Sequence, residues 1–168
     1  QSVSGATSIA ENFDTDVRLL LLNNQVPANT NSYFNGWDRS GAVPQTETAI
    51  HHPGGAIKKI SVDNNPATNS NGFGGRLPSG FWQVIWDEGM TEGGSSGCPL
   101  YDQNGRVVGQ NLGGIPGQCE NPQSVTKVFG KFSESWAHGG SSTNQLKDWL
   151  DPNNSNVLTL DGMDDITG

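Results

Sequence analysis

A short loop with two serines between glycines is the part of this sequence best suited to chemistry. Residues 91–100 read TEGGSSGCPL, with a strand-like run before them and a hairpin after them. A serine that attacks a carbonyl carbon has to sit on a sharp turn, so that its oxygen projects and neighbouring N–H groups can hold the developing oxyanion. Gly94 permits backbone angles that bulkier residues cannot adopt, and Gly97 leaves room for a substrate. The alternative is a polar loop that binds an anion in a backbone nest.

Nucleophilic serine chemistry also needs a base that takes the hydroxyl proton and a carboxylate that orients this base. Asp16 is the best candidate carboxylate, because it stands at the mouth of the apolar run 17–22, where a strand would hold it rigid and partly desolvated. A carboxylate that only caps the strand is the alternative. No histidine precedes Asp16, and the three histidines of the chain are His51, His52 and His138.

The composition indicates one β-rich domain. The 168 residues are 32% hydrophobic and include 23 Gly and 9 Pro, which punctuate the chain at short intervals. This profile is typical of an all-β barrel or sandwich. The net charge of −8 and the lack of a basic run exclude a nucleic-acid partner. No apolar stretch is long enough for a membrane span, and no cluster of His, Cys and carboxylates has ligand spacing, so we expect no metal or cofactor.

The elements that position the loop follow from alternation and turn chemistry. Residues 81–86 place Trp82, Val84 and Trp86 on one face of a strand that leads into the serine loop. Residues 100–109 form a hairpin that turns at an Asn-Gly pair. Further strands are expected at residues 17–22 (buried), 33–38 (with a glycine where another segment packs closely), 49–62 (strand, turn, strand), 124–132 and 157–160, and loops at 23–32 and 63–80.

One helix is predicted near the end of the chain. Ser142 and Gln145 match a capping box, and Leu146, Trp149 and Leu150 fall on one helix face before an Asp-Pro pair. The acidic tail that follows reads as a domain boundary or a frayed terminus.

The order Gly94-x-Ser96-Gly97-x-Pro99 resembles the nucleophile loop of trypsin-like serine proteases. On that resemblance Ser96 is the nucleophile, and the N–H groups of Gly94 and Ser96 form the oxyanion hole. Asp16 and the leucines after it resemble the segment with the orienting aspartate. Further matches resemble the bacterial lysyl endopeptidase group, at residues 36–38 (GWD), 49–53 (AIHHP), 59–61 (KIS), 91–92 (TE), 94–97 (GSSG) and 146–152 (LKDWLDP).

This resemblance covers residues 4–161 and implies an all-β, trypsin-like double β-barrel with a short C-terminal helix. It implies a secreted, bacterial serine endopeptidase that cleaves polypeptides through an acyl-enzyme. In the implied organisation the end of the first barrel, the inter-barrel crossing, the second barrel, and the helix with the tail are residues 1–22, 23–36, 37–141 and 142–168.

The family keeps its catalytic histidine in the first barrel, before the aspartate, where this sequence has none. His51 and His52 fall in a segment that the resemblance makes a structural strand end remote from the serine, and His138 reads as a loop residue. We therefore expect a C-terminal portion, almost inactive alone, whose partner is the missing N-terminal barrel on the same precursor or a separate chain. The absent initiator Met and leader agree with this expectation. A non-catalytic protease-like binding module is the alternative.

The resemblance also predicts an altered specificity pocket. The lysine-selecting acidic residue of the family falls at or beside Lys127, and its pocket-wall histidine falls at Leu112. If Lys127 faces the pocket, an acidic side chain before the scissile bond becomes the expectation; if it points outward, it has no such role. Glu92 could restore some basic preference, and Gly113 and Gly114 would pair with the substrate backbone as an added strand.

Two further positions leave questions open. Ser95 stands where animal trypsin-like enzymes carry an aspartate that pairs with a newly freed amino terminus, so any activation must rest on another device. Cys98 and Cys119 could form a disulfide with each other, or Cys119 could pair with a cysteine before residue 1.

Overall fold

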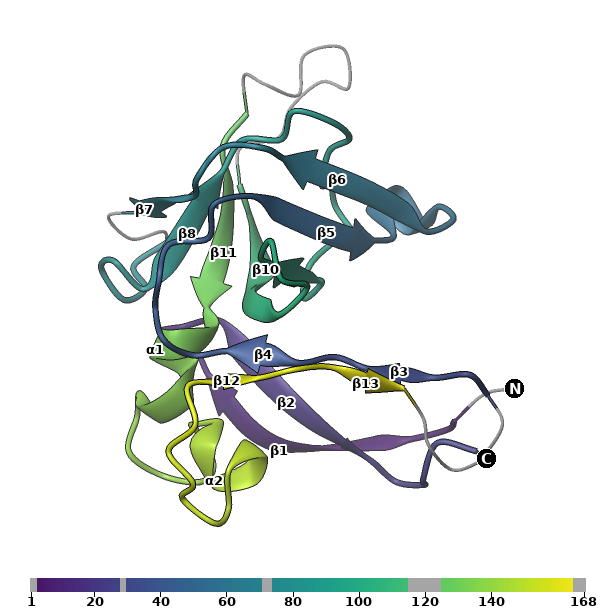
Figure 1. The fold of residues 1–168 in the computed structure, drawn as a ribbon, viewed down its shortest axis with the longest axis vertical. Helices are drawn as coiled ribbons and strands as arrows, with labels where there is room; N and C mark the ends of the chain where they lie inside the picture. Colours follow the sequence, from purple (N-terminus) through teal and green to yellow (C-terminus); the bar gives the residue numbers. More distant parts are fainter. Residues whose placement is uncertain (1–2, 28–29, 71–73, 115–124, 165–168) are drawn as a thin grey trace.

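The computed structural model describes residues 3–27, 30–70, 74–114 and 125–164, and β-strands dominate them (Figure 1). The predicted all-β class is confirmed. Beside the strands, this part of the chain has the helices α1 (Phe132–Ala137) and α2 (Lys147–Leu150) and a 3-10 turn at Pro53–Gly55. None of its helices is long and apolar enough to cross a membrane. The strands are β1 (Ala6–Asn12), β2 (Val17–Leu22), β3 (Tyr33–Phe34), β4 (Trp37–Asp38), β5 (Glu47–His51), β6 (Lys59–Asp63), β7 (Thr68–Ser70), β8 (Phe81–Val84), β9 (Pro99–Tyr101), β10 (Val107–Gly114), β11 (Lys127–Lys131), β12 (Thr159–Leu160) and β13 (Met163–Asp164).

One large sheet carries the serine loop between β8 and β9. Its strands follow the order β6-β5-β9-β10-β11-β8-β7, with β4 beside β10 and β12 beside β4. In the described residues β6 and β7 do not pair, so this sheet is open where the resemblance implies a closed barrel. The segment that connects β6 to β7 forms its backbone hydrogen bonds with other parts of the chain. Asn64 N–H donates to the Asp87 carboxylate, and Ala67 N–H donates to the Pro44 carbonyl.

The core of this sheet confirms the predicted face of β8. Trp82, Val84 and Trp86 are all at most 2% exposed and pack with Leu100 and Phe129. Trp86 meets Phe129 edge-on at 5.8 Å between ring centroids. Because this core includes residues on both sides of the serine loop, it fixes the two ends of that loop.

A second cluster attaches the first hairpin to the main sheet. Trp37 of β4 packs against Trp136 of α1 at 4.8 Å between ring centroids. Val17 and Leu19 of β2 pack against the same cluster, as does Leu150 of α2. The start of β2 is therefore held at the end of the main sheet, which is where Asp16 lies.

The prediction that residues 17–22 form a buried strand is half right. β2 is a strand, but Leu20, Leu21 and Leu22 are 52%, 56% and 47% exposed. β1 and β2 form a two-stranded ribbon that extends along the base of the molecule (Figure 1). In the described chain no third strand joins this ribbon, so only its inner residues reach the aromatic cluster.

Three local predictions needed correction. The capping box is wrong, because α2 begins at Lys147, Gln145 donates a hydrogen bond to Asp148, and the Ser142 carbonyl accepts one from Trp149. α1 was not predicted, since it follows β11 directly and has no capping side chain. β7 lies inside the predicted loop 63–80, where three polar residues pair with β8 without any apolar alternation.

Candidate active site

Backbone hydrogen bonds hold the serine loop from both sides. Gly97 N–H donates to the Asn111 carbonyl over 2.8 Å, and Asn111 N–H donates to the Cys98 carbonyl over 2.9 Å. On the other side, Gly54 N–H donates to the Gly93 carbonyl over 2.7 Å. The loop is therefore clamped between β10 and the 3-10 turn.

A hydrogen bond to the 3-10 turn fixes the direction of the Gly93–Gly94 peptide. A trans peptide points its C=O and N–H in opposite directions, and the described chain has no cis peptide. Since the Gly93 carbonyl is bound to Gly54, the Gly94 N–H is directed away from the 3-10 turn. Among the described residues, no partner uses the N–H groups of Gly94 or Ser96, and the Ser96 side chain is exposed. Two such N–H groups beside an exposed hydroxyl can stabilise a negatively charged oxygen.

Gly94 fits a position that other residues would strain. Its φ is 95°, and a Cβ there would lie 3.1 Å from the His52 carbonyl oxygen and 3.3 Å from the Gly55 nitrogen. The positive φ agrees with the expected need for backbone angles closed to bulkier residues.

A buried histidine holds the residue next to Ser96. The His51 ring is 2% exposed, with Nδ1 2.8 Å from Ser95 Oγ and Nε2 2.9 Å from Ser61 Oγ. Ser95 Oγ also accepts the Glu92 N–H over 3.1 Å. The resemblance makes this segment a strand end remote from the serine, but the His51 ring at the end of β5 contacts Ser95, the residue next to Ser96. Burial lowers the pKa of His51, His52 lowers it further, and Glu92 raises it.

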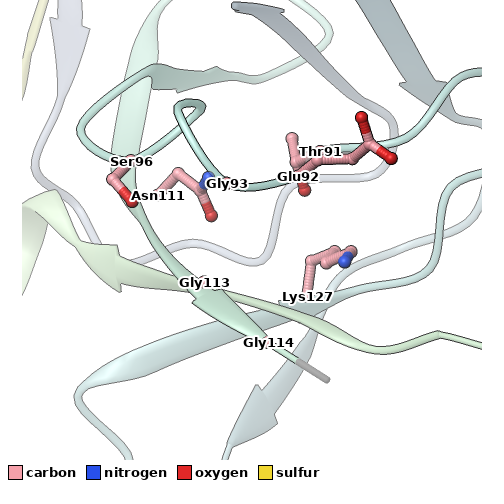
Figure 2. Close-up of a pocket in the computed structure, with 8 residues that line it drawn as sticks. All are labelled: Thr91, Glu92, Gly93, Ser96, Asn111, Gly113, Gly114 and Lys127. Carbon is pink, nitrogen blue, oxygen red and sulfur yellow. The ribbon is translucent and has the colours of Figure 1, made fainter. Parts of the chain in front are cut away.

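A cavity of about 270 Å³ opens beside Ser96 (Figure 2). The Lys127 side chain is 4% exposed and belongs to the lining, on the side opposite Ser96. The Asn111 Oδ1 atom is buried without a hydrogen-bond partner in the described structure, so it offers an acceptor in the wall. The complete lining is Thr91, Glu92, Gly93, Ser96, Asn111, Gly113, Gly114 and Lys127.

The two charges of this cavity differ in exposure. Burial lowers the pKa of Lys127, while the nearby Glu92 raises it. Glu92 itself is exposed. A buried charge acts through a lower effective dielectric than an exposed one, so the cation has the larger influence on a group that enters the cavity.

The end of β10 forms one wall of the cavity. Gly113 and Gly114 line it with φ values of 148° and 155°, and a Cβ on Gly114 would lie 2.4 Å from the Thr126 carbonyl oxygen. Leu112 is not among the lining residues.

Asp16 faces a second cavity, of about 520 Å³, which it shares with the serine loop through Gly97. Its backbone φ is 55°, and its Oδ1 accepts a hydrogen bond from Arg76 over 2.9 Å. The residue before it is held by Gln110, whose side chain donates to the Thr15 carbonyl. The other lining residues are Glu11, Asn12, Phe13, Val17 and Arg18. Neither this lining nor that of the first cavity contains a histidine.

Comparison with known protein families shows the family of this chain. The family described as lysyl endopeptidase, C-terminal domain matches residues 1–130. The chain belongs to the lysyl endopeptidase family. The matched part of that family is its C-terminal domain.

Solved structures similar to this lysyl endopeptidase domain include three of the Rv3671c protease. The active form from M. tuberculosis is 19% identical with a TM-score of 0.45, over 75% of this chain and 53% of that chain. The inactive form has the same identity, TM-score and share of this chain, and 60% of its own length is covered. The inactive Ser343Ala mutant from M. tuberculosis H37Rv is 17% identical with a TM-score of 0.44, over 75% and 58%. The domain thus spans a little over half the length of these structures.

The remaining polar candidates of the lysyl endopeptidase domain do not line the cavity beside Ser96. His52 is exposed and contacts the Ala56 carbonyl, and His138 pairs with Asp14 at 3.0 Å. Burial raises the pKa of the Cys98 thiol to about 12, and the proposed partner Cys119 lies outside the described residues. Within the described ranges, no group of three or more His, Cys, Asp or Glu side chains could hold a metal ion.

Proposed function

We propose that this domain is the nucleophile-bearing part of a serine endopeptidase that hydrolyses peptide bonds through an acyl-enzyme. The observation that carries the proposal is the serine loop, in which Ser96 is exposed and the N–H groups of Gly94 and Ser96 have no partner among the described residues. Secretion from a bacterial cell, which the resemblance implies, is part of the same proposal.

In this reaction the Ser96 oxygen attacks the carbonyl carbon of the scissile bond, and its proton passes to an imidazole. The N–H groups of Gly94 and Ser96 stabilise the oxyanion, and the amine leaves with the proton. Water then hydrolyses the acyl-enzyme by the same route. Both ring nitrogens of His51 are engaged elsewhere, and none of the three histidines lines either cavity. The imidazole therefore comes from a histidine outside residues 1–168 that enters the cavity between Asp16 and the serine loop. Residues 1–168 alone are then almost inactive.

The cavity beside Ser96 supports an acidic side chain before the scissile bond. A carboxylate about 4 Å from the Lys127 ammonium gains about 4 kcal/mol at an effective dielectric constant of about 20. The exposed Glu92 offsets this by about 0–1 kcal/mol, because solvent screens exposed charges. The same cation would repel a lysine side chain, so the lysine preference of the family is replaced.

The edge of β10 supports binding of the substrate backbone. β10 pairs with β9 as far as Gln110 and with β11 as far as Gly114, so in the described structure the last residues of β10 have a partner on one side. An extended peptide can add to the other side as a further strand, with backbone hydrogen bonds to Gly113 and Gly114.

The test is hydrolysis by the full-length natural gene product of peptides that differ only in Glu, Gln or Lys before the scissile bond. We expect cleavage that is lost in Ser96→Ala and fastest after Glu, and almost none by residues 1–168 alone. Equal or Lys-favouring rates would reject the acidic preference, and Ser96-independent cleavage would reject the mechanism.

A non-catalytic binding module is the second candidate, and the ion pair of Arg76 with Asp16 favours it because this pair occupies one carboxylate oxygen. This candidate predicts that a fluorophosphonate probe leaves Ser96 of the full-length protein unlabelled. The endopeptidase predicts labelling at Ser96 alone.

A further inference from the structure

The residue before the nucleophile is tied into the turn that shapes the oxyanion site. Ser95 N–H donates to the Glu92 carbonyl over 3.0 Å, and Ser95 Oγ accepts the Glu92 N–H over 3.1 Å. The Ser95 side chain therefore closes the turn 92–95 from inside. Ser95 is 1% exposed, so any hydrogen of its hydroxyl needs a protein partner.

His51 is that partner, and its own position is fixed in turn. Nδ1 lies 2.8 Å from Ser95 Oγ, and Nε2 lies 2.9 Å from Ser61 Oγ on the neighbouring strand β6. The pairing of β5 with β6 extends from Glu47 to His51, so the ring stands on a fixed ladder. A chain of contacts thus leads from Ser61 through His51 and Ser95 to the Glu92 N–H.

The chemistry of the groups selects one tautomer of the neutral ring. With the proton on Nε2, the ring donates to Ser61 Oγ and accepts the Ser95 hydroxyl hydrogen at Nδ1, so Ser95 Oγ keeps a lone pair for the Glu92 N–H. With the proton on Nδ1, or with both nitrogens protonated, the buried Ser95 hydroxyl hydrogen loses this acceptor. The arrangement therefore requires an uncharged His51.

The end of β5 holds the oxyanion peptide at a second point. The turn that follows His51 supplies the Gly54 N–H for the Gly93 carbonyl, and its His52 carbonyl lies against Gly94. The turn after β5 thus binds the loop at Gly93, and the His51 ring binds it at Ser95, on either side of Gly94.

We infer that His51 is a positioning residue that holds the oxyanion-binding part of the serine loop through Ser95. The inference rests on the proposed function, because the position of these N–H groups matters to a reaction only if Ser96 is the nucleophile. His51 takes the place of an ion pair to a freed amino terminus, which Ser95 cannot form. The titratable groups around the His51 ring are His52, Glu92 and Lys59, which is the cross-strand neighbour of His51. Burial and His52 lower the pKa of His51, and Glu92 raises it.

The experiment compares His51→Ala and Ser95→Ala in the full-length protein. His52→Ala is the matched control, because it removes an exposed ring and keeps the backbone carbonyl that lies against Gly94. We expect kcat to fall about 100-fold or more in the first two, with KM changed less than threefold, as when an oxyanion donor is lost. The kcat of the double variant should be no lower than that of the less active single variant, because each substitution breaks the same chain of contacts. His51→Gln, which can donate and accept, should recover part of the loss. Equal losses in the His51 and His52 variants, or additive losses in the double variant, would overturn the inference.

Amide hydrogen exchange gives a readout that does not depend on activity. The Glu92 amide should exchange at least 10-fold faster in His51→Ala and Ser95→Ala, and unchanged in His52→Ala, while the core amides of β8 keep their protection. Unchanged exchange at Glu92 would refute the role of His51 even in an active enzyme. If Ser96 of the wild-type protein is unreactive but Glu92 exchanges as expected, the proposed function fails while the His51 hold on the loop stands.

Discussion

Replacing Lys127 with Gln should remove the preference for Glu before the scissile bond. Lys127 is 4% exposed, so a carboxylate that reaches it loses its own hydration, and this cost offsets part of the attraction. From about 4 kcal/mol of direct attraction, less this cost and less the screened repulsion from Glu92, about 2–3 kcal/mol remains. Since about 1.4 kcal/mol is a factor of ten, the wild-type protein should favour Glu over Gln by about 30- to 150-fold in kcat/KM.

The assay is kcat/KM of the full-length protein on two peptides that differ only in Glu or Gln at that position. In Lys127→Gln the ratio should fall to within threefold of one. Lys131→Gln is the matched control, because Lys131 is a buried lysine on the same strand that contacts Asn69 and Trp82 instead of the cavity. The reasoning is refuted if Lys127→Gln keeps the wild-type ratio, or if Lys131→Gln loses it equally.

Two further substitutions test the frame of the site. Gly94→Ala should destabilise the fold by about 1–2 kcal/mol in urea unfolding and lower kcat by about 100-fold. The reasons are the φ of 95° and the His52 carbonyl oxygen, which would lie 3.1 Å from the new Cβ. Wild-type values in both assays would contradict this. Burial raises the pKa of Glu47 from 4.5 to about 8, so the folded state binds more protons than the unfolded state and wild-type stability falls as pH rises between these values. Glu47→Gln should lack this fall, and its stability should rise relative to wild type by on the order of 1 kcal/mol for each pH unit from 5 to 8; a constant difference between the two proteins would show that Glu47 does not titrate as described.

The sequence predicted those parts of the fold that depend on local patterns. The alternation of Trp82, Val84 and Trp86 is confirmed because one face of β8 meets the core. A Cβ on Gly36 would lie 2.1 Å from the Leu160 carbonyl oxygen, as expected of a glycine where another segment packs closely. β7 and α1 escaped prediction because long-range pairing and an abrupt strand-to-helix change decide them, and neither leaves a periodic signal.

The site depends more on tertiary contacts than the strands do. Ser95 and His51 are 44 positions apart, and no spacing rule links a strand end to a loop that follows three strands later. The sequence did show that Ser95 lacks the ion pair of animal enzymes, and this gap is the signal that could have prompted a search for another partner. The exposure of Leu20, Leu21 and Leu22 was equally hidden, because an apolar run reads as buried whether or not a neighbouring strand covers it.

The most direct test of the central claim is the rate at which a fluorophosphonate labels Ser96. This rate is compared between the full-length wild-type protein and its Asp16→Asn variant. The account predicts labelling at Ser96 alone, slowed by about 10³- to 10⁴-fold in Asp16→Asn, because the carboxylate orients the imidazole that activates the serine. Labelling that is independent of Asp16, or no labelling of the wild-type protein, would contradict it.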